Sequence, residues 1–142
     1  TPGDVVDYGY LANHLEKLAM DYNVKYYCGD PWHLEVLKQR MNADEQGKFV
    51  RIEQTMAGET PALNELERLF REGKISHEEN PCGRWAFGNA VIAIDGNENK
   101  KLMKNRSIDR IDPTCALMDA MAGAVRLEPE RSVYENRGLR VI

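Results

Sequence analysis

Two short runs of β-forming residues, each preceded by a helix-like pattern, constrain the fold of this chain more than any other feature. The runs cover residues 24–28 and 49–52. Because the order along the chain is helix, strand, helix, strand, we expect the two strands to pair in parallel through a right-handed crossover. The sequence therefore predicts an α/β fold in which helices flank a sheet.

In the first half of the chain, we expect one helix before the first strand and another directly after it. Asp7 can cap a helix that runs to Tyr22. The strand at residues 24–28 leads into Asp30 and Pro31, and proline suits the first helical position because its missing N–H costs nothing there. The stripe of this second helix that we expect to be buried consists of Trp32, Leu34, Leu37 and Met41. Asp30 is thus predicted at the carboxyl end of a strand and at a helix N-cap.

The middle of the chain predicts two further helices. Thr60 and Pro61 are expected to open the first of them, which ends at Gly73. After a turn-rich connector, Pro81 is expected to start a brief helix that reaches Asn89. Both assignments use proline as the marker of a helix start.

A hairpin and a long helix follow. Residues 91–94 and 100–103 predict two strands joined by a tight turn. Asp112 and Pro113 then repeat the Asp-Pro pattern and begin the last helix. Its expected packing face consists of Ala116, Leu117, Ala120 and Ala124. Small residues there would allow a close approach to a sheet.

Length and composition indicate one globular unit. A chain of 142 residues predicts a single domain. Its 42% hydrophobic content and mean hydropathy of −0.57 are typical of a soluble globular protein. No apolar run approaches the ~18 residues that a membrane span needs, and the first residues resemble no signal peptide. We therefore expect no membrane partner.

The net charge of −4 argues against a nucleic-acid binder, because phosphate neutralisation needs clustered lysine and arginine. The distribution qualifies this conclusion. Residues 1–98 hold 10 basic and 17 acidic side chains, whereas residues 99–142 hold 9 and 6. Much of the basic excess lies between Lys100 and Arg110. Charge alone favours a solvated hairpin there.

The cysteines and histidines predict neither a disulfide framework nor a zinc site. Three cysteines, at positions 28, 82 and 115, form no Cys-x-x-Cys pair. The three histidines show no metal-ligand spacing. A reducing cytosolic setting fits this pattern.

The residues that can carry chemistry are aspartates. No phosphate-binding loop or dinucleotide-binding turn is present. Asp30 and Asp112 share a setting in which proline follows and a helix begins, so both could simply cap helices. Alternatively, they converge at one edge of the sheet and hold Mg²⁺, which prefers hard oxygen ligands and keeps positions open for phosphate oxygens.

Two such ions, ~3.5 to 4 Å apart, would activate a water and stabilise the leaving oxygen in phosphodiester hydrolysis. Asp109 and Asp119 are reserve candidates for the same site. Asp119 would share a helix face with Asp112, but at ~10 Å along the axis it is expected to be too far away to share an ion with it.

Several segments together resemble the C-terminal nuclease portion of the large terminase subunit of tailed bacteriophages, the motor that packages and cuts concatemeric DNA. Each segment is a weak signal alone, and their order and spacing carry the resemblance. The segments are Thr1-Pro2-Gly3-Asp4-Val5-Val6-Asp7-Tyr8, Asp30-Pro31-Trp32, His77-Glu78-Glu79-Asn80-Pro81, Trp85, Asn89, Lys104, Ile111-Asp112-Pro113 and Ser132-Val133-Tyr134-Glu135-Asn136-Arg137-Gly138-Leu139.

The resemblance implies a partial ribonuclease-H-like fold with an extra β-hairpin before the last helix. It also implies an endonuclease that uses Mg²⁺ or Mn²⁺ in a two-ion site to cut double-stranded DNA. Asp30 and Asp112 match catalytic, metal-binding positions of the family, and Asp109 is a weaker ligand candidate. The first family aspartate lies on an opening strand that this sequence lacks. We therefore expect the isolated fragment to be inactive or weak, with an exposed sheet edge open to self-association.

The resemblance also implies a DNA path and partners. Lys104 and Arg106 are expected to contact the DNA backbone. Partners would be double-stranded DNA, the portal protein, the small terminase subunit and an upstream ATPase domain of the same chain. The expected location is the host cytoplasm, on the procapsid during packaging. We assign residues 1–127 to the nuclease domain and residues 128–142 to a C-terminal tail.

Two alternatives stay open from the sequence. The region could be a docking module for the portal or the small subunit, without catalysis of its own, with the tail from Glu128 as the adhesive element. It could also be a ribonuclease-H-like domain of a resolvase or transposase. The pattern of Trp85, Asn89 and Tyr134 argues against the second of these by resemblance.

Overall fold

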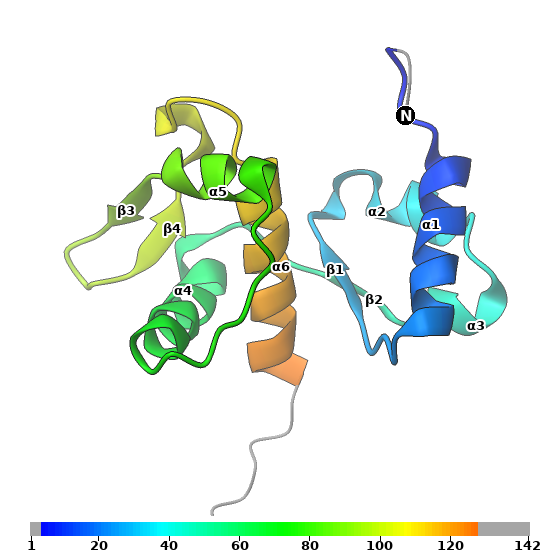
Figure 1. Cartoon of the computed structure of the whole chain (residues 1–142), viewed down its shortest axis with the longest axis horizontal. Helices are drawn as coiled ribbons and strands as arrows, with labels where there is room; N and C mark the ends of the chain where they lie inside the picture. The colour runs from blue at the N-terminus through cyan, green and yellow to red at the C-terminus, as the bar shows by residue number, and fades with distance from the viewer. Residues whose placement is uncertain (1–3, 128–142) are drawn as a thin grey trace, which may run out of the picture.

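The computed structural model describes residues 4–127 (Figure 1). Within this range no helix is long and apolar enough to cross a membrane. The elements in chain order are α1 (Tyr8–Asp21), β1 (Tyr27–Gly29), α2 (Pro31–Lys38), α3 (Ala43–Gln46), β2 (Phe49–Arg51), α4 (Met56–Arg71), α5 (Pro81–Gly88), β3 (Ile92–Ile94), β4 (Lys100–Leu102), the 3-10 turn η1 (Lys104–Arg106) and α6 (Asp112–Leu127).

The strand pairing confirms the predicted α/β class. β1 and β2 pair in parallel, with Cys28 opposite Val50. β3 and β4 form the predicted antiparallel hairpin before the last helix, with Ala93 opposite Lys101. The described residues thus contain two separate two-stranded sheets rather than one mixed sheet.

Side-chain caps begin the helices of the first half where the sequence predicts them. Asp7 Oδ1 accepts hydrogen bonds from the backbone N–H groups of Gly9 and Tyr10, at 2.9 and 3.1 Å. Asp30 Oδ1 accepts one from the N–H of Trp32 at 2.9 Å, and Pro31 is the first residue of α2. The prediction that Trp32 is buried is wrong, because its side chain is 81% exposed on the first turn of the helix.

The predicted start of α4 at Thr60 is also wrong. Thr55 Oγ1 accepts a hydrogen bond from the N–H of Gly58 at 3.0 Å and so begins the helix one turn earlier, at Met56. A Cβ at Gly58 would lie 2.3 Å from the carbonyl oxygen of Glu53, so only glycine fits this tight entry. Pro61 therefore lies inside the helix. The predicted end is confirmed, since Gly73 has a φ of 62°.

The core lies where α4, α6 and β4 meet, and α6 stands between the two halves of the molecule (Figure 1). The buried residues of α6 are Thr114, Cys115, Met118, Asp119, Ala122 and Gly123. The predicted face of Ala116, Leu117, Ala120 and Ala124 points outward instead. The close approach is made by Gly123, where a Cβ would lie 2.2 Å from Cys28 Sγ on β1.

Candidate functional site

Two carboxylates from distant parts of the sequence, Asp30 and Asp119, interact electrostatically. Asp30 follows β1 directly and caps α2 through one oxygen. Asp119 lies in the third turn of α6 and is only 8% exposed. The negative charge of Asp30 contributes to the raised pKa of Asp119, so the two carboxylates interact electrostatically. The packing of α6 on β1 creates this pair.

Asp119 opens onto a small cleft of about 10 Å³, which has room for about one water molecule. The cleft lies between the loop before α4, the start of α4, the hairpin and α6. Its lining residues are Gln54, Glu59, Leu102, Lys104, Cys115, Met118 and Asp119. Polar and charged groups of four segments therefore face the same small space.

The pKa of Asp119 is raised to about 6. Burial is the largest cause, because it disfavours the ionised form. The negative charges of Asp30 and Glu59 raise the pKa further, while the Lys104 ammonium and the Gln54 side chain lower it. A buried acid beside like charges is a common feature of functional sites.

Glu59 is a second buried acid at the cleft, 6% exposed. Burial raises the pKa of Glu59. The hydrogen bond from the Leu102 N–H and the positive charges of Lys101 and Lys104 lower it in part. Its Oε2 accepts a hydrogen bond from the N–H of Leu102 at 2.7 Å. One oxygen of Glu59 therefore fastens α4 to β4 while the side chain adds negative charge to the cleft.

The other predicted aspartates lie elsewhere. Asp112 is exposed on the first turn of α6, two turns or ~10 Å along the axis from Asp119. Its charge acts on Cys115. Asp109 is exposed, and its Oδ1 accepts a hydrogen bond from the N–H of Arg110 at 2.8 Å. Asp119, which the sequence ranks only as a reserve, is the aspartate whose pKa is raised by the charge of Asp30.

A signal for Asp119 exists in the sequence. Cys115, Met118 and Ala122 form an apolar stripe at helical spacing, and Asp119 is the acid that lies on that stripe. A carboxylate on the buried face of a helix needs a partner or a function. A comparison of the position of Asp119 with that of Asp112 alone misses this signal.

The donor chemistry of the site fits a hard divalent cation. Asp30 and Asp119 offer carboxylate oxygens, and Mg²⁺ is commonly bound through one or two carboxylates together with waters and phosphate oxygens. Within residues 4–127, however, no three His, Cys, Asp or Glu side chains converge closely enough to hold a metal ion by themselves. The pair fits a site that substrate and solvent complete.

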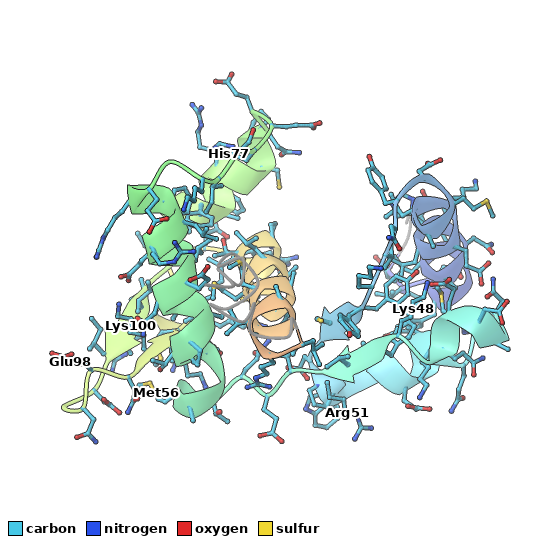
Figure 2. All side chains as sticks on the ribbon, turned by 90° about the horizontal axis from the view of Figure 1, so that it is seen from below. Lys48, Arg51, Met56, His77, Glu98 and Lys100 are labelled. Atoms are coloured by element: carbon cyan, nitrogen blue, oxygen red, sulfur yellow. The ribbon has the colours of Figure 1, made fainter. Side chains whose placement is uncertain are left out.

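The predicted DNA-contacting residues lie in η1, directly after β4. Lys104 and Arg106 are both exposed, and Lys104 also lines the cleft. Lys100, by contrast, is bound to Glu67 of α4, with its Nζ 2.8 and 2.9 Å from the two carboxylate oxygens. Figure 2 shows Lys100 on the hairpin beside α4. Part of the basic excess of this region is therefore structural.

A second, larger groove of about 1030 Å³ lies on another part of the molecule. It runs between the end of α4, the connector at residues 74–80, α5 and the start of α6. Leu69, Phe70, Phe87, Leu117 and Met121 give it an apolar character. Asp119 lines the small charged cleft and not this groove, so the charged cleft is the better candidate for chemistry.

Residues 3–128 match the family model described as the terminase large subunit, endonuclease domain. The chain belongs to this family. It is 28% identical to the terminase large subunit of Enterobacteria phage HK97 over 127 residues. This alignment covers 87% of this chain and 25% of the HK97 protein. The crystal structure of the HK97 bacteriophage large terminase matches with a TM-score of 0.75 and 27% identity over 87% of this chain and 26% of that one.

The predicted resemblance to the terminase nuclease domain is thereby confirmed. The chain spans about a quarter of the length of the HK97 protein it matches. The structural match agrees with the observed α/β fold of helices and small sheets. The tail segment at residues 132–139 and the first three residues, which contribute to the resemblance, lie outside the described residues.

Proposed function

We propose that this terminase domain is a metal-dependent endonuclease that cuts double-stranded DNA during genome packaging, with Asp30 and Asp119 as the metal-binding pair. The observation that carries this proposal is the cleft that buried Asp119 lines together with Glu59 and Lys104, with the charge of Asp30 acting on Asp119. Carboxylates that repel each other are stabilised when a dication binds between them.

Each residue has a defined task in this scheme. Asp30 offers one oxygen to the cation while the other caps α2, which holds the carboxylate at the end of β1. Asp119 is held by the packing of α6 and supplies the second carboxylate. When bound, Mg²⁺ or Mn²⁺ would lower the pKa of a water and neutralise charge on the phosphate that is cut.

The two carboxylates leave coordination positions for waters, phosphate oxygens and a further acid, and a second ion requires that further acid. Asp112 and Asp109 stay predicted ligands from the sequence. Their exposed positions suit contact with an ion or phosphate at the outer side of α6 more than sharing an ion with Asp119. A ribonuclease-H-like fold for the whole domain also belongs to this proposal.

The proposed partners follow from family membership. Double-stranded DNA would meet Lys104 and Arg106 beside the cleft, and the portal, the small subunit and an ATPase domain of the same chain would act with the domain in packaging. We place this work in the host cytoplasm, at the procapsid. Within the described residues β1 pairs only with β2, which leaves self-association through its other edge as part of the proposal.

The test is DNA cleavage by the full chain that carries this domain. Linear double-stranded DNA is incubated with Mn²⁺, with Mg²⁺ or with a chelator. We expect cleavage with the cations, none with the chelator, and a loss of at least about 100-fold in Asp30→Asn and in Asp119→Asn. Cleavage at the wild-type rate in either variant would exclude that residue from the site.

The docking alternative depends on a tail that begins at Glu128, outside the described residues. It predicts that the chain binds the portal or the small subunit without any response to metal. Retention of that binding after removal of residues 128–142 would count against the tail as the adhesive element.

A further inference from the structure

We propose that Lys104 is a catalytic residue, whose ammonium group binds the phosphate to be cut at the cleft that Lys104 and Asp119 line, rather than only following the DNA backbone. This inference rests on the proposed function above. It assigns to Lys104 a task different from that of Arg106, although the two residues lie in the same turn and carry the same charge.

The backbone holds Lys104 firmly at the cleft. The N–H of Met103 donates to the carbonyl of Val91 at 2.8 Å, which extends the hairpin ladder to the residue before Lys104. The Met103 carbonyl in turn accepts from the N–H groups of Arg106 and Ser107, both at 3.0 Å, and from Ser107 Oγ at 2.9 Å. η1 is thus a closed turn, and Lys104 starts it beside the cleft.

The charge of Lys104 reaches buried groups of two helices. It acts on Asp119 and Cys115 of α6 and on Glu59 of α4. Lys104 also lines the cleft itself. Arg106 is not among the charges that shift the pKa values of these three groups. The ammonium of Lys104 therefore lies in the electrostatic field of the carboxylates, which separates it from the other basic residues of the region.

The Lys104 ammonium is also uncommitted. Among residues 4–127, no ion pair within 4.0 Å joins it to a carboxylate. Lys100, the first residue of β4, is instead neutralised by Glu67. An exposed lysine that faces a cleft without an ion pair can bind an arriving anion, and lysine binds phosphate as a point charge.

Phosphate needs such a cation at this place. The cleft presents Asp119 and Glu59, the charge of Asp30 acts on Asp119, and an approaching phosphodiester carries a further negative charge. A fixed cation that contacts the phosphate at the reacting centre stabilises the charge that develops during the reaction, which lowers the barrier rather than only improving binding. The same cation repels a metal ion, so removing it should tighten metal binding in the absence of DNA.

The test compares Lys104→Met, Lys104→Arg and Arg106→Met in the full chain. Cleavage of double-stranded DNA with Mn²⁺ gives kcat and KM, and calorimetry without DNA gives the Mn²⁺ affinity. We expect Lys104→Met to lower kcat by about 100-fold with a smaller change in KM, and to bind Mn²⁺ about 3- to 10-fold more tightly. Lys104→Arg should retain more of kcat than Lys104→Met.

Arg106→Met is the matched control for loss of a positive charge from the same turn. We expect it to raise KM more than it lowers kcat and to leave Mn²⁺ affinity unchanged. If Lys104→Met behaves like Arg106→Met in both measurements while the wild type cleaves, the inference is wrong and the proposed function stands. If the wild type neither binds Mn²⁺ nor cleaves, both are wrong.

Discussion

Asp119 is the residue at which stability and function oppose each other most clearly. It lies on the packed face of α6 between Cys115 and Ala122, where an apolar side chain would fit the core. Burial and the neighbouring charges of Asp30 and Glu59 make its ionised form costly. A structural role does not require an acid at this position, whereas a cation site does. Destabilised groups of this kind are typical of functional sites.

This cost predicts a pH dependence of stability in metal-free buffer. The pKa of Asp119 is about 6 in the folded state, above its unfolded value, so the folded state holds the proton between about pH 4 and pH 6. The contribution of protonated Asp119 to the free energy of unfolding is therefore complete below about pH 4 and is lost as the pH rises through about 6. Relative to wild type, Asp119→Asn should gain about 1 to 3 kcal/mol of unfolding free energy between pH 4 and pH 7.5.

Urea unfolding of both proteins across this pH range, with chelator present, measures the difference. Asp112→Asn is the control, since it removes a negative charge from the exposed start of the same helix. A difference between wild type and Asp119→Asn that stays constant with pH would contradict the account of Asp119 as a buried, repelled acid.

At the scale of elements, the sequence predicts helix starts better than helix faces. Asp7 and Asp30 cap helices where the sequence predicts them, because a cap is a local interaction between neighbours in sequence. The helix predicted to start at Pro81 does start there, capped by Asn80. The start of α4 is mispredicted because the Thr55 cap, rather than Pro61, decides it.

The face of α6 is mispredicted for a different reason. Alanine fits an interior and a surface equally well. A helix face made of three alanines and one leucine therefore does not identify the side that packs against the core. The decisive contact is between Gly123 and Cys28, which are far apart in sequence. The position of Asp119 at the cleft depends on that contact between distant residues, which the sequence alone does not reveal. Asp112 stays the partner of Asp30 that the family resemblance predicts.

The approach of α6 to β1 gives a prediction for Gly123→Ala. A Cβ there would lie 2.2 Å from Cys28 Sγ, so the helix or the strand has to move. We expect a loss of about 1 to 3 kcal/mol of unfolding free energy and weaker Mn²⁺ binding, since Asp30 and Asp119 separate. Thermal unfolding and calorimetry measure the two effects.

Gly88→Ala is the matched control, because Gly88 also lies in a helix and a Cβ there meets nothing within 4 Å. It should leave both quantities nearly unchanged or raise stability slightly. Equal stability of Gly123→Ala and wild type would show that the close contact does not set the position of α6.

At the scale of the whole molecule, α6 connects two halves that are each built around a small sheet. It packs on β1 on one side and on α4 on the other (Figure 1). The candidate site lies along this helix, because Asp119 lines the cleft with Glu59 and Lys104 of one half and its pKa responds to the charge of Asp30 of the other. Family membership gives the chain a role in terminases, and the position of α6 gives that role a specific place.

The most direct test of the site is a crystal structure of the full chain grown with Mn²⁺, with anomalous data to locate the ion. The account predicts a Mn²⁺ peak between the carboxylates of Asp30 and Asp119, at about 2.0 to 2.3 Å from an oxygen of each. Asp119→Asn crystals should lack this peak and Asp112→Asn crystals should keep it. A Mn²⁺ ion bound at Asp112 with none at Asp119 would contradict the assignment.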